Sequence, residues 1–361
     1  MAERRGGVVG GGPGGEKARQ LQAALRGSLW FACLEAFLCI VEFTLVMFGL
    51  AVVHRLVVQP FVVDPGASAF AYQKCASLTG VEPAEFQASK LPSLLACLMG
   101  EEWRSAALQV ASSCACTAAL LGWMWWRFIR PLVVRGSYGS SWIGLDKLPR
   151  LSKLAMYLLA YQLCSFLFYV YLYSALRGGT FLSLDNYLSP VAQLSPTDAD
   201  DSPSFRFDFV RAVHMLFLDP LKEELVFRGC ILLILWNRSK DARRCALLSS
   251  VFFGLFHLIN LASSHFSKGY VLFQIALGME IGLFYSLQVM ATSSLWESVL
   301  LHITNNVLSS LMSATQTPLF ADPLLLFSVL QTVVVYCWLD MKLLRSGDNT
   351  IVDHPSTKRP P

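Results

Sequence analysis

The sequence predicts an all-α membrane protein, a polytopic helical bundle of about eight transmembrane helices. Of the 361 residues, 54% are hydrophobic and only 15% are charged, whereas a soluble domain has roughly 25% charged residues. Several apolar runs approach the roughly 20 residues with which a helix crosses a bilayer. Most Lys and Arg residues fall between these runs on one predicted side of the membrane, which is typical of cytoplasmic loops.

The expected spans differ in the regularity of their apolar sequence. The first, third and eighth expected spans are almost continuously apolar, whereas polar residues interrupt the fourth and seventh spans. In chain order the spans are expected at residues 29–53, 105–129, 154–176, 210–236, 245–261, 271–290, 295–312 and 324–344. With basic loops in the cytoplasm, both termini are expected on the cytoplasmic side. The net charge of +4 then reflects membrane orientation, and no nucleic-acid partner is expected.

The chain divides into five parts. Residues 1–28 are expected to form a flexible Gly-rich tail and carry no signal-peptide pattern. Residues 29–177 hold three spans, and the Asp- and Pro-containing residues 178–208 are expected to form a loop. Residues 209–345 hold the other five spans, and residues 346–361 are expected to form a disordered tail. Most of the ten cysteines lie in apolar runs without a CxxC pair, so we expect them to pack as small apolar residues.

The fourth span contains the stretch "KEELVFRG", which places charge where hydrocarbon is expected. Glu223 and Glu224 are adjacent, so their side chains point about 100° apart on a helix. Glu224 precedes Arg228 by four residues, which is the favourable order for a helical ion pair. Glu223 is left without a local partner. A carboxylate in that position tends to hold its proton or to find a partner on another helix.

Two other spans contribute polar side chains without local partners. The fifth span contains His257, and the seventh contains His302 and Asn306 four residues apart on one helix face. A single histidine in a membrane helix is more often a packing hydrogen-bond donor than a catalytic group. Ionisable residues on three separate spans, however, are typical of a functional cavity inside a membrane protein.

Three stretches taken together identify a family resemblance. "EELVFRG" has the pattern EExxxR, "SSVFFGLFHL" has the pattern FxxxH, and "SSLWESVLLHITNN" joins an S-L-W lead to HxxxN. Their order and spacing resemble the CPBP family of intramembrane proteases, which includes the type II CAAX prenyl endopeptidases and bacteriocin-immunity relatives. The resemblance covers residues 210–313. After His257 the sequence reads "LIN", where the eukaryotic prenyl endopeptidases carry a His-rich run.

The resemblance implies a peptidase that activates water with a glutamate. Its catalytic groups would be Glu223, His257, His302 and Asn306. Glu223 would be the general base and His257 would hold the water with it. His302 and Asn306 would donate hydrogen bonds to the oxyanion. The ion pair of Glu224 and Arg228 would fix the helix and the electrostatic field around the base.

A zinc site is the alternative to a metal-free mechanism. Glu223, His257 and His302 are acceptable zinc ligands, which would make the protein a metalloendopeptidase. The HExxH pattern of helical zinc proteases is absent from the sequence. Asn306 is a poor zinc ligand but a good oxyanion donor. We therefore favour a mechanism without a cofactor and keep zinc as the alternative.

Three functions stay open at this point. The first is removal of the last three residues of prenylated CAAX proteins, which implies the endoplasmic reticulum, or otherwise an organellar membrane. The prenyl chain of such a substrate would lie in the bilayer along Phe227, Phe252 and Phe256. The second is cleavage of another membrane peptide or protein by the same site. The third is a non-catalytic membrane scaffold, against which the complete set of glutamate, two histidines and asparagine argues.

Overall fold

The computed structural model describes residues 28–58, 91–131, 151–177, 182, 188–190, 205–207, 209–239, 241–262, 268–311 and 322–350. Within these ranges the chain is helical apart from short connections and one pair of three-residue strands. The strands β1 (Leu188–Pro190) and β2 (Phe205–Phe207) are antiparallel. The expected all-α class is thereby confirmed, and the strands lie in or beside the segment expected as a loop.

Three long helical segments precede the strands. The helix α2 (Leu29–Val53) continues into the π-helical turn η1 (His54–Val58). The helix α4 (Leu91–Met124) likewise continues into η5 (Trp125–Ile129), and α6 (Lys153–Arg177) follows. The expected first three spans therefore lie on helices. Residues 1–27 of the expected Gly-rich tail lie outside the described residues.

The second half begins with one continuous helical segment that changes its winding. Its parts, in order, are α7 (Phe209–Val213), η8 (His214–Leu218), α8 (Asp219–Glu224), η9 (Leu225–Ile231) and α9 (Leu232–Ser239). The two π-helical turns η8 and η9 flank the charged helix α8. Such turns are often found at functional sites.

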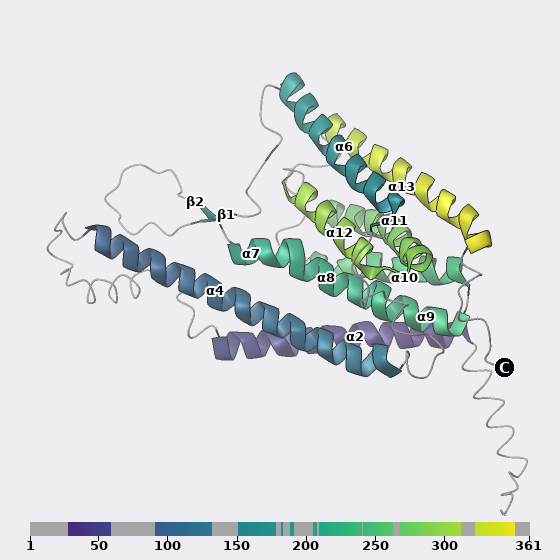
Figure 1. Cartoon of the computed structure of the whole chain (residues 1–361), viewed down its shortest axis with the longest axis horizontal. Coiled ribbons are helices and arrows are strands. Elements are labelled where there is room, and N and C mark those ends of the chain that lie inside the picture. The colour runs from purple at the N-terminus through teal and green to yellow at the C-terminus, as the bar shows by residue number, and fades with distance from the viewer. Residues whose placement is uncertain are drawn as a thin grey trace, which may run out of the picture.

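Four further helices complete the described chain (Figure 1). They are α10 (Ala242–Phe256) with its 3-10 extension η10 (His257–Ala262), α11 (Lys268–Thr292), α12 (Leu295–Ser310) and α13 (Pro323–Thr350). The helix α13 runs five residues past the boundary expected at residue 345, so 346–350 is helical where a disordered tail was expected. Residues 351–361 lie outside the described chain.

Six of the helices are long and apolar enough to cross a membrane. These six are Leu29–Leu56, Ser105–Ile129, Lys153–Arg177, Ala242–Ala262, Lys268–Thr292 and Pro323–Arg345. The other two expected spans are also helical. One is the charged segment that contains α8, and the other is α12, which has only 16 residues. The protein is therefore a multi-pass membrane protein, and many large apolar side chains lie exposed on its outer faces.

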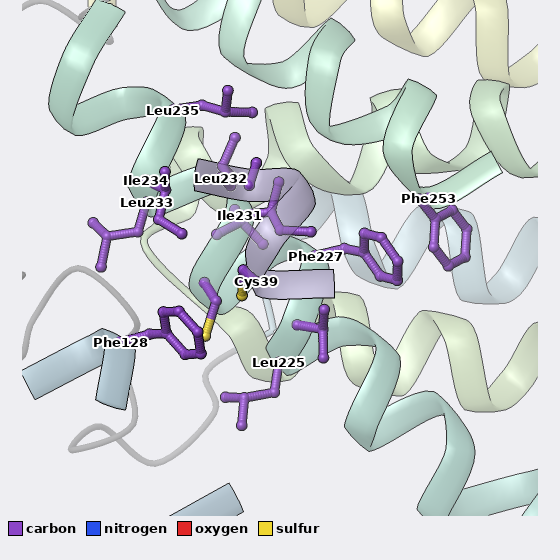
Figure 2. Close-up of a cluster of buried hydrophobic side chains, with 14 of the residues drawn as sticks. Cys39, Phe128, Leu225, Phe227, Ile231, Leu232, Leu233, Ile234, Leu235 and Phe253 are labelled. Atoms are coloured by element: carbon purple, nitrogen blue, oxygen red, sulfur yellow. The ribbon is translucent and has the colours of Figure 1, made fainter. Parts of the chain in front are cut away.

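The helices α10 and α11 pack closely, and one glycine makes this approach possible. A Cβ atom on Gly254 would lie 2.8 Å from the carbonyl oxygen of Ile275 and 2.4 Å from Cγ of Met279. Small residues at such contacts let membrane helices approach closely. The main apolar cluster lies beside this contact, where Figure 2 shows Cys39 of α2 among side chains of η9 and α9.

Polar contacts tie the helices together at several points. Glu35 on α2 accepts hydrogen bonds of 3.2 and 2.6 Å from Arg238 on α9. Glu42, seven residues further along α2, pairs with Arg127 at 3.1 Å. Ion pairs between helices offset part of the cost of placing charge in hydrocarbon. The Glu35–Arg238 pair also fixes α2 against the segment that carries the charged helix α8, and the Glu42–Arg127 pair fixes α2 against η5.

Candidate active site

The ion pair expected within the fourth span is present and fully buried. Arg228 Nη1 donates to Glu224 Oε1 over 2.8 Å, and both side chains have 0% exposure. Glu224 ends α8 and Arg228 lies in the π-helical turn η9. The four-residue spacing therefore predicted this contact correctly. A buried pair of this kind is costly to break, because removal of one partner leaves an uncompensated charge.

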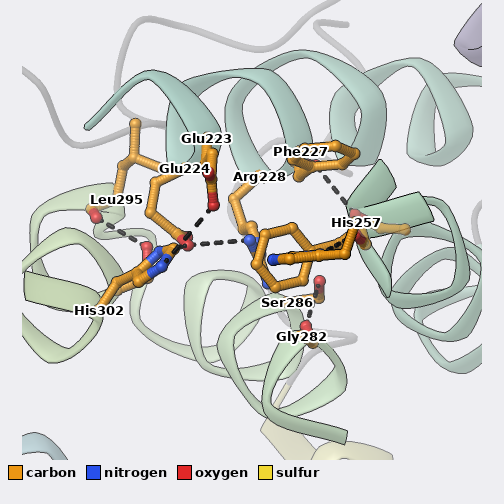
Figure 3. A network of polar contacts seen from close by, with 12 residues as sticks. Glu223, Glu224, Phe227, Arg228, His257, Gly282, Ser286, Leu295 and His302 are labelled. Carbon is orange, nitrogen blue, oxygen red and sulfur yellow. Dashed lines mark hydrogen bonds and ion pairs between the residues drawn. The ribbon is translucent and has the colours of Figure 1, made fainter. Parts of the chain in front are cut away.

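His302 on α12 joins this ion pair and lies between the two glutamates (Figure 3). Its Nδ1 is 2.8 Å from Glu224 Oε1, and its Nε2 is 3.7 Å from Glu223 Oε2. A carboxylate that already accepts from Arg228 can only accept from the imidazole, so Nδ1 carries the hydrogen. The Nε2 atom then faces Glu223.

Glu223 and Glu224 differ sharply in their surroundings. The Glu223 side chain is 25% exposed, whereas Glu224 is fully buried. The sequence predicted that Glu224 would pair and that Glu223 would need a partner on another helix. That partner is His302, whose contact with Glu223 was not predicted from the sequence.

Two aromatic rings and a glycine hold Arg228 in place. Its Cζ lies 4.2 Å from the ring centre of Phe253 on α10 and 5.4 Å from that of Tyr285 on α11. Guanidinium groups are attracted to the faces of such rings. A Cβ on Gly282 would come within 3.1 Å of Arg228 Nη2 and 3.0 Å of the Phe253 ring. Only glycine at position 282 leaves room for the side chains of Arg228 and Phe253.

Three buried polar atoms of the ion pair have no hydrogen-bond partner within the described chain. They are Glu224 Oε2, Arg228 Nε and Arg228 Nη2. Buried polar atoms in proteins are nearly always paired with protein or ordered water. The cluster therefore has unused capacity to bind water next to the partly exposed Glu223.

His257 lies on the other side of the Phe253 ring. It begins η10, and its Nδ1 lies 3.0 Å from the carbonyl oxygen of Phe253. The Phe253 ring centre is 5.0 Å from that of His257 and 5.9 Å from that of His302. Among the described contacts, none joins His257 directly to Glu223. The two histidines are thus brought into one neighbourhood with an aromatic ring between them.

Asn306 shares a face of α12 with His302 but contacts a different part of the fourth span. Its Nδ2 donates to the carbonyl oxygen of Met215 in η8 over 3.2 Å. His302 and Asn306 of α12 therefore contact the same helical segment at two points, Glu224 and Met215. One amide hydrogen of Asn306 is used by this bond, and the second stays available.

The residues do not form a metal site in this arrangement. Within the described chain, no group of three or more His, Cys, Asp or Glu side chains is placed to hold a metal ion. Of the three alternative zinc ligands, Glu223 and His302 face each other, while His257 turns Nδ1 to the carbonyl of Phe253.

A supporting carboxylate was missed by the sequence analysis. Glu297 is buried in the first turn of α12, and its two oxygens accept three hydrogen bonds. Ser152 donates its backbone N–H over 2.5 Å and its hydroxyl over 3.0 Å, and Gln288 donates over 2.7 Å. Glu297 thus joins α6 and α11 to the helix that carries His302. Its presence within "SLWESVLLH" is the only signal that could have indicated it.

The expected prenyl contact at Phe227 is wrong. Phe227 is buried, and its ring packs against those of Phe253 and Phe256 at 5.1 and 5.5 Å. Phe252 and Phe256 are partly buried against the same core cluster. A prenyl chain was expected to lie against this ring, but Phe227 in η9 faces the interior of the bundle.

Comparison with known families agrees with the motifs. Residues 205–308 match the family model described as type II CAAX prenyl endopeptidase Rce1-like. No curated protein and no solved structure matches the chain. The matched residues include all six motif side chains, so the resemblance to the CPBP family is confirmed. This part of the chain is therefore similar to membrane-embedded proteases of the CAAX/CPBP type, and the similarity implies a peptidase.

Proposed function

We propose that this protein is an intramembrane endopeptidase that uses Glu223 to activate water and removes the C-terminal tripeptide of prenylated CAAX proteins. One observation supports this mechanism above all, namely the contrast between two neighbouring carboxylates. Glu224 is fully buried and bound by Arg228 and His302. Glu223 is a quarter exposed, so it is the carboxylate that water and substrate can reach.

His302 would stabilise the negative oxygen that forms when water attacks the peptide carbonyl. Because its Nδ1–H is bonded to Glu224, the ring can donate from Nε2 only as an imidazolium. Glu223 and Glu224 would balance that charge from both sides. A charged donor in place before the reaction contributes more to the transition state than to the ground state. The second amide hydrogen of Asn306 would donate to the same oxygen.

Hydrolysis would begin with the attack of water on the scissile peptide bond. The water oxygen bonds to the scissile carbonyl carbon, one water proton moves to the Glu223 carboxylate, and the carbonyl electrons move to oxygen. When the C–N bond breaks, Glu223 returns the proton to the leaving amine. His257 would hold the water through Nε2, because its Nδ1 faces the Phe253 carbonyl.

A lipid-modified substrate fits the surface beside His257. Four large apolar side chains on α10 and η10 are exposed on both sides of it in the sequence: Leu255, Leu258, Ile259 and Leu261. A prenyl chain enters the bilayer with a gain of about 0.8 kcal/mol per buried CH₂ group. It would lie against these side chains and carry the bond after the modified cysteine to Glu223. Processing of such proteins implies the endoplasmic reticulum, with the site open to the cytoplasmic leaflet.

One observation favours a second substrate class. The "LIN" stretch after His257 replaces polar histidines with two apolar residues and Asn260, which donates to Gln274 over 2.9 Å. The same glutamate mechanism could then act on a membrane peptide that carries no prenyl group.

The test uses the purified full chain in liposomes with two matched peptides. A farnesylated CAAX peptide and its unmodified form would be incubated separately, and the products would be identified by mass. We expect cleavage after the modified cysteine only in the farnesylated peptide. Cleavage of an unprenylated membrane peptide, with both CAAX peptides intact, would support the second substrate class. Absence of any peptide cleavage would contradict the peptidase proposal itself.

A further inference from the structure

A second polar cluster lies outside the six motif residues. It joins α4 to the start of the fourth helical segment. His214 Nε2 lies 2.7 Å from the hydroxyl oxygen of Ser113, and His214 Nδ1 lies 3.8 Å from Asp219 Oδ1. Lys222 Nζ lies 2.6 Å from the same Asp219 oxygen. None of these four side chains has a role in the proposed peptidase reaction.

The contacts run from Ser113 through His214 to Asp219, which is the arrangement of groups that makes a serine hydroxyl nucleophilic. A hydroxyl bonds one imidazole nitrogen, and a carboxylate faces the other nitrogen of the same ring. Lys222 favours the ionised form of Asp219, which can only accept a hydrogen bond. His214 then carries its hydrogen on Nδ1 and accepts from Ser113 through Nε2. The distance of 3.8 Å between His214 and Asp219 is long, but such bonds often shorten when substrate binds.

The surroundings of the cluster indicate which substrate could reach it. Ser113 lies within the membrane-spanning stretch Ser105–Ile129 and is 7% exposed. The His214 side chain is 36% exposed, so the cluster opens to the outer face of the protein. Leu108 on α4 and Phe217 on η8 are large apolar side chains that are also exposed. A molecule that reaches Ser113 therefore arrives through the hydrocarbon of the bilayer.

We propose that Ser113, His214 and Asp219 form a second catalytic site, which hydrolyses an ester or thioester carried by a lipid chain. Ser113 Oγ bonds to the carbonyl carbon, and its proton moves to His214 Nε2. The C–O or C–S bond breaks, and the alkoxide or thiolate leaves with that proton. Water then attacks the acyl-serine, His214 takes and returns one proton, and a carboxylic acid is released.

The first test is covalent labelling of the full chain in liposomes with a fluorophosphonate probe. In this reaction the serine oxygen bonds to phosphorus, fluoride leaves and the histidine accepts the proton. We expect the probe on Ser113, as located by peptide mass. Ser113→Ala should abolish the labelling, and His214→Gln should reduce it at least tenfold. Glu223→Gln should label like the wild type, which separates this site from the peptidase site.

Ser112 provides the matched control. Its hydroxyl bonds to the carbonyl oxygen of Gln109 on the same helix over 3.0 Å, so Ser112→Ala should keep full labelling. Hydrolysis of a long-chain acyl ester in the same liposomes should be lost in Ser113→Ala and kept in Glu223→Gln. Gel filtration of each variant checks the fold. If His214→Gln aggregates, Asp219→Asn replaces it, and we expect this variant to lose at least tenfold of the labelling. An unlabelled Ser113 in the wild type would overturn the proposal, because the Ser113–His214 bond would then only join two helices.

Discussion

Glu223 and Glu224 are neighbours in the chain, yet their carboxylates have opposite surroundings. Glu224 is held by Arg228 and His302 within 2.8 Å of each, and it is fully buried. Glu223 lies 3.7 Å from the Nε2 of His302, which is its ion pair within the described residues, and it is partly exposed. At the scale of single residues, the site therefore separates a buried, paired carboxylate from a partly exposed one. Substitution should separate them too.

Glu223→Gln and Glu224→Gln should fail in different ways. Gln at 223 keeps the shape but cannot accept the water proton, so peptidase activity should fall by about 10²–10⁴-fold while the melting temperature stays near that of the wild type. Gln at 224 leaves the buried Arg228 without its counter-charge, which typically destabilises a fold by about 3–5 kcal/mol. Product formation measures the activity of each variant, and thermal unfolding in detergent measures its stability. Glu42→Gln is the control, because it breaks the partly exposed pair of Glu42 with Arg127. Wild-type activity in Glu223→Gln would mean that another residue is the base.

Removal of metal should leave the activity largely unchanged. The proposed mechanism uses a carboxylate, two histidines and an amide, and no step needs a Lewis acid. Dialysis against EDTA followed by the peptide assay should therefore keep most of the rate, and metal analysis should find no stoichiometric zinc. A loss of activity that zinc restores would make Glu223, His257 and His302 the ligands instead. It would also require His257 to turn its ring away from the Phe253 carbonyl.

At the scale of elements, α11 supports the site although it carries none of the motif residues. Gly282 lets α11 approach Arg228 and Phe253, and the ring centre of Tyr285 lies 5.4 Å from Cζ of the guanidinium. Local spacing predicted the Glu224–Arg228 pair, because both residues lie on one helix. It could not predict the contacts of His302 with Glu224 or of Glu297 with Ser152, because these join residues 78 and 145 positions apart. Such contacts depend on helix packing, which periodicity does not specify.

Gly282→Ala should disturb the site from α11. The added methyl group would lie 3.1 Å from Arg228 Nη2 and 3.0 Å from the Phe253 ring. Overpacking of this kind costs about 1–3 kcal/mol, and a displaced Arg228 would also lose its position on Glu224. We expect a lower melting temperature and lower peptidase activity.

Gly122→Ala on α4 is the matched control for that variant. No atom lies within 4 Å of a Cβ built at Gly122, and Ala favours a helix over Gly. This variant should match or exceed the wild type in stability. If both alanine variants behave alike, the close approach of α11 does not position Arg228.

At the scale of the whole molecule, two arginines near helix ends lie together at one end of the bundle. Arg238 at the end of α9 binds Glu35 near the start of α2, and Arg243 near the start of α10 donates to the carbonyl of Leu344. Arg177 faces Asp322 at the other ends of α6 and α13, over 3.7 Å. Figure 1 shows the later ends of α4, α9 and α13 on one side of the bundle. Charge bias along the sequence predicted this grouping, because a membrane restricts where helix ends can lie.

The same grouping predicts the orientation of the protein in the membrane. Lys and Arg near helix ends stay on the cytoplasmic side, so both termini should be cytoplasmic and the segment 178–208 should lie on the opposite side. An acceptor sequence for N-glycosylation inserted near residue 195 should be glycosylated in microsomes, with a shift in gel mobility. The same acceptor fused after residue 361 should stay unmodified, because the enzyme that attaches the glycan acts only in the lumen. This orientation places the α9 and α13 ends toward the leaflet where prenylated proteins are anchored. Glycosylation of the C-terminal acceptor alone would invert the bundle and would leave such substrates on the wrong side of the membrane.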